Sequence, residues 1–116
     1  MFKKTVLSVA AFAITGCASV QIPADSLERS EASVRAAEEL GANGVPTARL
    51  HLQMAKDQTE AAKRMAENGD ERAILVLARA EADAELALGM AREVSTHTEA
   101  ERASEDLKAV KARVNP

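Results

Sequence analysis

Aromatic residues are almost absent from this sequence, which has two phenylalanines and neither tryptophan nor tyrosine. Phe2 and Phe12 both lie close to the N-terminus, so the rest of the chain has no aromatic side chain. Small-molecule sites are mostly lined by large apolar and aromatic groups, and single-stranded nucleic acids stack their bases on aromatic rings. We therefore expect no small-molecule substrate, no cofactor and no nucleic-acid partner.

The chain also lacks a second cysteine and a long apolar run. Its single cysteine, Cys17, has no disulfide partner within the chain. As a helix, the short apolar segment 5–16 would extend at most about 18 Å, whereas the hydrocarbon core of a bilayer is about 30 Å thick. This segment is too short to span a membrane.

A basic start, Met1-Phe2-Lys3-Lys4, precedes this short apolar run. That order is typical of a secretory signal, which is removed from the mature protein. We assign residues 1–16 to the signal peptide. The mature chain then has 13 basic and 18 acidic residues, a net charge of −5. Such a chain is a poor partner for nucleic acid or for an anionic membrane surface.

The residues Ile14-Thr15-Gly16-Cys17 resemble the bacterial lipobox. The resemblance implies that a signal peptidase recognises Ile14, Thr15 and Gly16, that it cleaves before Cys17, and that Cys17 carries fatty acyl chains such as palmitate. Two or three chains anchor a protein stably, whereas one chain alone holds it only marginally. The alternative is an ordinary signal cleaved near Ala18, which leaves a soluble protein.

No aspartate follows the cysteine, since the next residues are Ala18 and Ser19. In lipoproteins of this kind the absence of that aspartate implies the outer membrane, facing the periplasm. We expect residues 17–25 to be the lipidated cysteine and a short tether, which contains Pro23 and has no helical period. Residues 26–116 then form one helical domain.

Helix boundaries are readable in the first part of this domain. Asp25 and Glu28 have the spacing of a capping box, which predicts a helix over residues 26–40. Glycines and Pro46 in the segment 41–46 predict a connection into a second helix over residues 46–67. Asn68-Gly69-Asp70 then combines a glycine C-cap with an aspartate N-cap, which predicts a tight turn into a third helix.

Small and apolar residues repeat in heptads along the second and third helices. The repeat predicts two buried seams that pack against each other, made mostly of alanine. In the second helix the seam is Ala48, Leu52, Ala55, Thr59, Ala62 and Ala66, and in the third it is Ala73, Leu77, Ala80, Ala84, Ala87, Ala91 and Val94.

The heptad phase slips around residues 95–98, because the later apolar residues do not continue the earlier seam. These later residues are Ala100, Ala103, Leu107, Val110 and Val114. We expect one long helix with a weak point at the slip, and the alternative is a fourth helix capped by Thr98 and Glu101. The predicted fold is all-α, either an antiparallel helical hairpin or a small bundle of three to four helices with Ala-rich, coiled-coil-like packing.

The run from Leu77 to Ala87 (LARAEADAELA), the Gly69 turn and the alanine spacing of residues 48–66 are similar to a bacterial lipoprotein family catalogued as domain of unknown function 4398. The resemblance covers roughly residues 27–91. It implies a lipobox, a tether and Ala-rich helices, and it brings no assigned activity.

Catalytic and metal-binding patterns are lacking. Cys17 is consumed by lipid, and no base and orienting group accompany a Ser or Thr nucleophile. Glu93 and His97 are four residues apart, which is half of a metal site, and we interpret them as a solvated pair. We interpret His51 as a histidine at the boundary between the core and the solvent-exposed surface. Glu81, Asp83 and Glu85 are interpreted as a solvated face, because residues two apart on a helix point apart.

We therefore expect no enzyme. The predicted function is that of an outer-membrane-anchored helical interaction or scaffold module, with a protein partner or a second copy of the chain on its helix faces. The alternative is a structural spacer of the small coiled-coil lipoprotein type. Two features weigh against a spacer: no lysine stands at the end of Arg113-Val114-Asn115-Pro116, and the Gly69 turn folds the chain back on itself.

Overall fold

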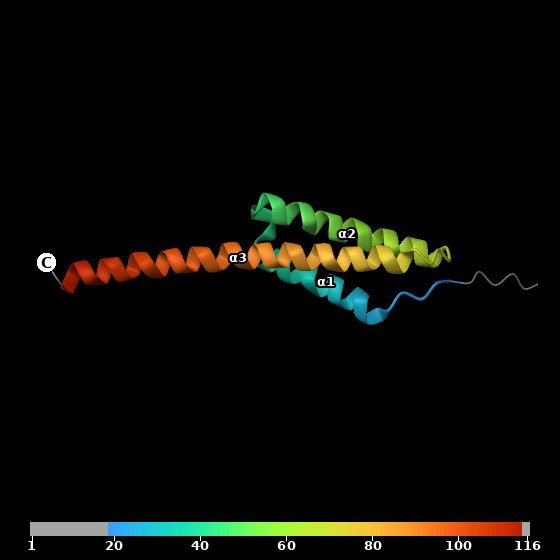
Figure 1. Ribbon diagram of the computed structural model, residues 1–116, viewed down its shortest axis with the longest axis horizontal. Coiled ribbons are helices and arrows are strands. Elements are labelled where there is room, and N and C mark those ends of the chain that lie inside the picture. The colour runs from blue at the N-terminus through green and yellow to red at the C-terminus, as the bar shows by residue number, and fades with distance from the viewer. Residues whose placement is uncertain (1–18, 115–116) are drawn as a thin grey trace, which may run out of the picture.

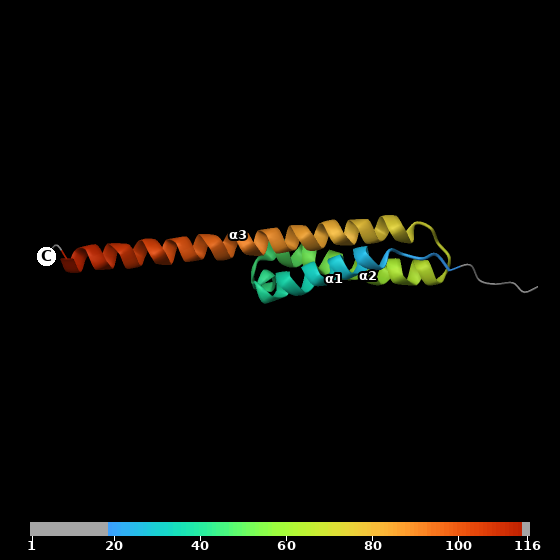
Figure 2. The same ribbon diagram turned by 90° about the horizontal axis from the view of Figure 1, so that it is seen from below.

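The computed structural model describes residues 19–114, and within this range it is entirely helical apart from short connections. Helix α1 spans Ala24–Glu39, the short 3₁₀ helix η1 spans Ala42–Gly44, α2 spans Pro46–Glu67 and α3 spans Ala73–Val114. Helices α1 and α3 run in the same direction and α2 runs against both (Figures 1 and 2). The all-α class is confirmed, as a three-helix bundle in which α1 and α2 both pack on α3.

The bounds predicted for α2 are confirmed at both ends. Val45 is extended, and Pro46 occupies the first turn, where its missing N–H costs nothing. At the other end Gly69 has φ 73°, and its N–H donates to the Ala66 carbonyl at 3.0 Å. Asp70 N–H donates to the Met65 carbonyl at 2.9 Å. These two bonds form a Schellman motif, which satisfies carbonyls that the helix end leaves free.

Asp70 caps the turn that leads into α3, as predicted. Its carboxylate accepts the Arg72 backbone N–H at 3.0 Å, and its own carbonyl accepts the Ala73 N–H at 3.0 Å. The Arg72 guanidinium also donates to this carboxylate, which lowers the pKa of Asp70 below its usual value. The link between α2 and α3 is therefore held by local contacts on both sides of Gly69.

We expect Gly69→Ala to lower the free energy of unfolding by about 1–2 kcal/mol, because a Cβ atom is unfavourable in the left-handed region. Gly44→Ala is the matched control, since Gly44 has no positive φ and nothing lies within 4 Å of an added Cβ. Urea denaturation followed by circular dichroism measures both changes. Equal midpoints for the two variants would contradict the role given to Gly69.

The start of α1 differs from the prediction. The helix begins at Ala24, Pro23 is its N-cap, and no side chain caps it. The Leu27 N–H donates instead to the Pro23 carbonyl at 3.2 Å. The capping box at Asp25 and Glu28 is therefore wrong: an N-cap residue needs an extended backbone, and Pro23, at φ −60° and ψ 123°, already provides it. Asp25 lies in the first turn, where its negative charge interacts favourably with the positive end of the helix dipole.

The two predicted seams are buried, with one exception. Every predicted seam residue of α2 is buried, and so are six of the seven predicted for α3. Val94 is the exception, because it lies beyond the contact with α2 and is exposed. Leu88 is buried in addition, since α3 contacts α1 as well as α2 and needs a wider apolar face than a single seam.

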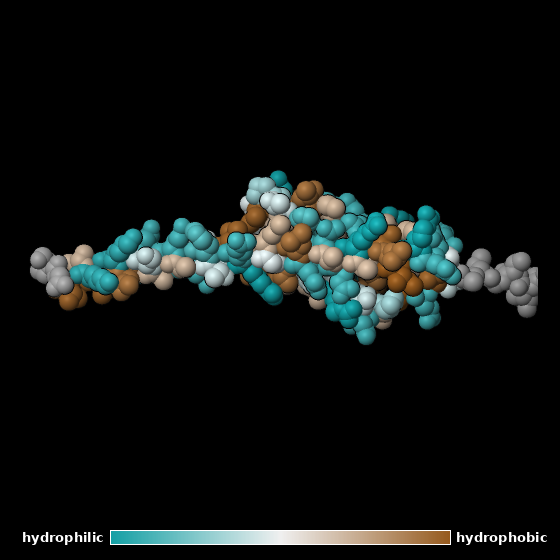
Figure 3. Space-filling view, viewed as in Figure 1, coloured by the Kyte–Doolittle hydropathy of each residue, from teal (hydrophilic) through white to brown (hydrophobic). Residues whose placement is uncertain are grey.

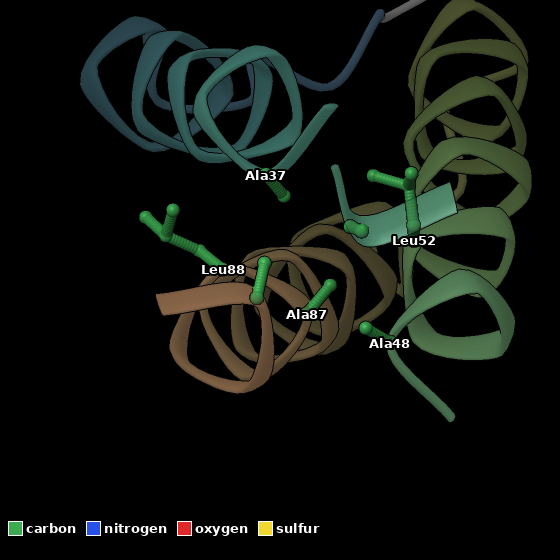
Figure 4. Close-up of a cluster of buried hydrophobic side chains, with 7 residues drawn as sticks. Ala37, Ala48, Leu52, Ala87 and Leu88 are labelled. Atoms are coloured by element: carbon green, nitrogen blue, oxygen red, sulfur yellow. The ribbon is translucent and has the colours of Figure 1, made fainter. Parts of the chain in front are cut away.

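The core is built almost entirely from alanine. Figure 4 shows side chains from all three helices, among them Ala37, Leu52 and Ala87, around a common space. Ala42 of η1 closes one end of this cluster. Among the fully buried residues, Leu52 and Leu77 are the largest. Each alanine buries only one methyl group, so stability depends on close helix approach and on high helix propensity.

Helix α3 continues without a break through the phase slip and runs for 42 residues. The prediction of one long helix is confirmed. Thr98 does not cap a fourth helix, because its hydroxyl donates to the Val94 carbonyl at 2.9 Å, inside α3. Beyond Ala91 no residue of α3 is buried, and this part extends past the ends of α1 and α2 (Figure 1). We call residues 95–114 the distal half of α3.

Candidate interaction surface

The predicted lipidation and processing residues lie outside the described part of the chain. These are Cys17 and the recognition residues Ile14, Thr15 and Gly16. The first contact that the structure describes near them is the Val20 N–H, which donates to the Ala66 carbonyl at 3.1 Å. The segment predicted as a tether therefore contacts the C-terminal end of α2 at Val20.

The distal half of α3 carries the main apolar feature of the surface. Ala100, Ala103, Leu107, Val110 and Val114, which we call the distal stripe, are all exposed. Leu107, Val110 and Val114 are 55%, 54% and 71% exposed. From the helical period of 100° per residue, this stripe lies about 140° around α3 from the seam that faces α1 and α2. In Figure 3, brown and tan residues recur among teal ones along the protruding helix.

Polar side chains join the three helices, including two that were interpreted as part of a solvated face. Glu81 accepts a hydrogen bond from Arg29 Nε of α1 at 2.6 Å, which raises the pKa of Arg29. Asp83 is half-buried against α2, 2.8 Å from His51 Nδ1 and 2.8 Å from Gln58 Nε2. The interpretation of Glu81 and Asp83 as solvated is therefore wrong, because α1 packs beside Glu81 and α2 packs beside Asp83.

His51 is a boundary histidine, as interpreted from the sequence. It is half-buried, and its ring nitrogen meets the Asp83 carboxylate. His97 Nδ1 lies 3.5 Å from a Glu101 carboxylate oxygen and forms no ion pair with Glu93, so its partner is one turn later than predicted. Among residues 19–114, no three His, Cys, Asp or Glu side chains gather closely enough to hold a metal ion.

A buried pair of hydroxyls links α1 to α2. Ser30 Oγ lies 3.2 Å from Thr59 Oγ1, and Thr59 donates to the Ala55 carbonyl at 2.8 Å. Because Thr59 has only one hydroxyl proton, Ser30 is the donor to Thr59 Oγ1. The heptad pattern placed Thr59 in the core, but no sequence signal pointed to Ser30 as its partner.

Lysines of α2 bridge to glutamates of α1 beside this pair. Lys63 Nζ donates to Glu31 at 3.0 Å, and Lys56 donates to Glu38. The hydrogen bond to Glu31 raises the pKa of Lys63. These contacts are partly exposed, where an ion pair contributes about 0–1 kcal/mol, so they orient α1 on α2 more than they stabilise it.

An open groove of about 360 Å³ lies between α1 and α2. Its lining is mostly charged and contains one valine: Glu31, Val34, Arg35, Lys56, Thr59 and Glu60. Binding pockets for small molecules are concave and mostly apolar, with a few polar groups. The exposed surface of the groove is nevertheless mostly apolar, because the aliphatic stems of its charged side chains contribute to it. Two of its charged groups already form ion pairs across the α1–α2 contact, Lys56 with Glu38 and Glu31 with Lys63.

Comparison with known proteins yields no assignment. No protein-family model matches the chain, and no curated protein or solved structure matches it significantly. In the described part of the chain, no helix combines the length and the apolar character needed to cross a bilayer. The surface itself is therefore the source of any functional argument.

Proposed function

We propose that this chain is a lipoprotein, anchored through Cys17 to the periplasmic face of the outer membrane, and that it acts as a helical interaction module without catalytic activity. The lipobox residues Ile14 to Cys17 support the anchor. The resemblance to the lipoprotein family named above is part of this proposal. The groove between α1 and α2 is open, and none of the residues that line it is aromatic.

The positions of the two ends of the described chain support this arrangement. The described chain begins at the end of the bundle where α2 turns into α3, and the C-terminal end of α3 lies at the opposite end (Figure 1). A helix of 42 residues is about 63 Å long at 1.5 Å per residue. With lipid on Cys17, three residues before Val20, the bundle stays near the membrane and α3 projects away from it.

The observation that carries the proposal is the exposed distal stripe at the far end of this projection. A helix in a water-soluble domain ordinarily buries its apolar face, and here that face has no neighbour among residues 19–114. The bundle thus positions an apolar helix surface at a distance from its anchor. Such a surface is suited to receive another helix.

Photo-crosslinking in the intact envelope tests this function. A crosslinking residue at Ala103 lies on the distal stripe, and the same residue at Glu105 lies two positions on, on another face of α3. We expect the Ala103 probe to capture a discrete protein product at least about tenfold more efficiently than the Glu105 probe. Equal, diffuse labelling from both positions would contradict an interaction module.

The spacer remains the second candidate, and the length of α3 is the observation that favours it. A straight rod of about 63 Å is suited to bridge a gap between two layers. In the same experiment a spacer predicts crosslinks from the end of α3 to the cell wall and none to a protein. The identity of the captured product therefore separates the two functions.

A further inference from the structure

The distal stripe is the last part of a longer pattern on the outer side of α3. Its alternating steps of three and four residues continue towards the bundle through Gly89, Leu86, Ala82 and Leu75, with polar residues at Arg79, Glu93 and Thr96. We call these positions, from Leu75 to Val114, the outer seam. All of them are exposed, because α1 and α2 pack on the other side of α3.

An unbroken heptad spacing of this length indicates what kind of partner fits. On a straight helix a heptad stripe drifts by about 20° per repeat, so it faces one direction throughout only when another helix winds around it. The outer seam spans nearly six heptads, more than the three to four that indicate a coiled coil. The partner is therefore a long helix with the same repeat.

Gly89 points to close approach of a second backbone. Glycine is the least favourable residue after proline in the interior of a helix. Nothing within 4 Å would meet a Cβ atom added at Gly89, so no contact in this chain requires a glycine. Gly89 is an outer-seam position, where the missing side chain lets a partner helix come close.

One pair of charges beside the seam fits a parallel second copy of the chain. Asp106 directly precedes Leu107, and Lys111 directly follows Val110, so the two lie on opposite flanks of the seam, five residues apart. In a parallel, in-register pair of identical helices, flanking residues at this spacing meet across the interface, Asp106 of each chain with Lys111 of the other. An antiparallel pairing of the two distal stripes brings the two Asp106 carboxylates together but also places Glu99 of each chain opposite Arg113 of the other, so the direction follows from the shared membrane anchor rather than from charge.

We propose that the outer seam docks a second copy of this chain, α3 against α3, parallel and in register. The proposal deepens the proposed function, since two chains anchored in one membrane present their α3 helices in the same direction. Arg79 and Glu93 face their own copies, which weakens the contact near the bundle and holds the register. The tightest contact then lies along the distal stripe, whose helix has no other support.

Disulfide formation between copies tests the face and the direction. The full chain with Cys17→Ser receives one new cysteine, either Leu107→Cys on the seam or Glu105→Cys off the seam. Each protein is purified in mild detergent and then oxidised. We expect Leu107→Cys to form a covalent dimer at least tenfold faster than Glu105→Cys, because in-register cysteines come within disulfide range. Preferential crosslinking of a Leu107→Cys chain to an Ala103→Cys chain indicates antiparallel pairing and would overturn the proposal.

A charge on the seam tests the same surface without cysteine chemistry. Val110→Glu places a carboxylate on the distal stripe, and Ala112→Glu places it off the seam, in the same turns of α3. In sedimentation equilibrium of the Cys17→Ser chain, we expect Val110→Glu to raise the dimer dissociation constant at least tenfold and Ala112→Glu to leave it within twofold. Circular dichroism checks that both variants keep the bundle.

If the Cys17→Ser chain with an unsubstituted outer seam has a monomeric mass at the highest soluble concentration, the proposal is overturned. In that case the envelope crosslinks from Ala103 show whether only the dimer is rejected or the proposed interaction module as well. Capture of a different protein there leaves the interaction module intact and rejects the second copy. Retention of the protein in the membrane fraction after loss of the lipid, with an intact dimer, rejects the lipid anchor alone.

Discussion

Leu77→Ala should lower the free energy of unfolding by about 2–5 kcal/mol, the range found for leucines removed from packed cores. Leu77 is 1% exposed. Three of its neighbours along the α3 seam, Ala73, Ala80 and Ala84, are alanines, which have no rotamers with which to fill the space. The substitution therefore leaves a cavity. For a domain of this size, whose total stability is about 5–10 kcal/mol, the loss is a large fraction of the whole.

Leu50→Ala is the matched control, because Leu50 is 58% exposed on α2 and does not belong to the outer seam. Surface substitutions of this kind change stability by about 0.5 kcal/mol or less. Chemical denaturation of both variants, followed by circular dichroism at two protein concentrations, separates the core effect from any effect of association. A shift for Leu77→Ala no larger than that for Leu50→Ala would show that the alanine core does not depend on its few leucines.

The helical core was predictable because the heptad pattern is local information. The buried residues of α2, from Ala48 to Ala66, follow directly from steps of three and four along the sequence. The Gly69 turn was predictable for a similar reason, since only a residue without a Cβ atom enters the left-handed region freely. Patterns of this kind require no knowledge of how the helices are placed.

Contacts between helices were not predictable, because they depend on how the helices are rotated about their axes. Arg29 and Glu81 are 52 residues apart and meet only when α1 packs parallel to α3. The roles of Asp83 and Ser30 have the same origin: each is polar, and each is placed against a partner by packing that no local repeat encodes. Val94 shows the converse, since the repeat includes it but the partner helix ends before reaching it.

The exposed outer face of α3 could be seen in the sequence only in part. The stripe from Ala100 to Val114 was recognised, but its extension through Gly89 to Leu75 overlaps the run that contains the buried seam. Both patterns have the same period and differ only in phase. Burial in the three-helix bundle separates them, because it assigns one phase to α1 and α2 and leaves the other exposed.

Cys17→Ala should move the protein almost completely from the membrane fraction to the soluble fraction. Each buried methylene of an acyl chain contributes about 0.8 kcal/mol, so losing two or three chains removes the whole anchor. No helix in residues 19–114 offers a substitute, since none is long and apolar enough to span a bilayer. Sedimentation of the envelope, with labelled palmitate incorporated during growth, measures both the location and the lipid.

The Cys17→Ala chain keeps its uncleaved signal peptide, which is itself apolar. A further variant therefore separates the effect of this peptide on location from the effect of the lipid. Residues 1–17 are exchanged for an ordinary cleavable secretory signal, which delivers residues 18–116 to the periplasm without a cysteine. We expect this chain to be soluble and unlabelled, whereas Ser19→Ala, which retains Cys17, stays in the membrane fraction and carries label. If the cysteine-free chain still sediments with the membrane, the bundle itself binds there, and the exposed apolar face of α3 becomes the surface to test for that attachment.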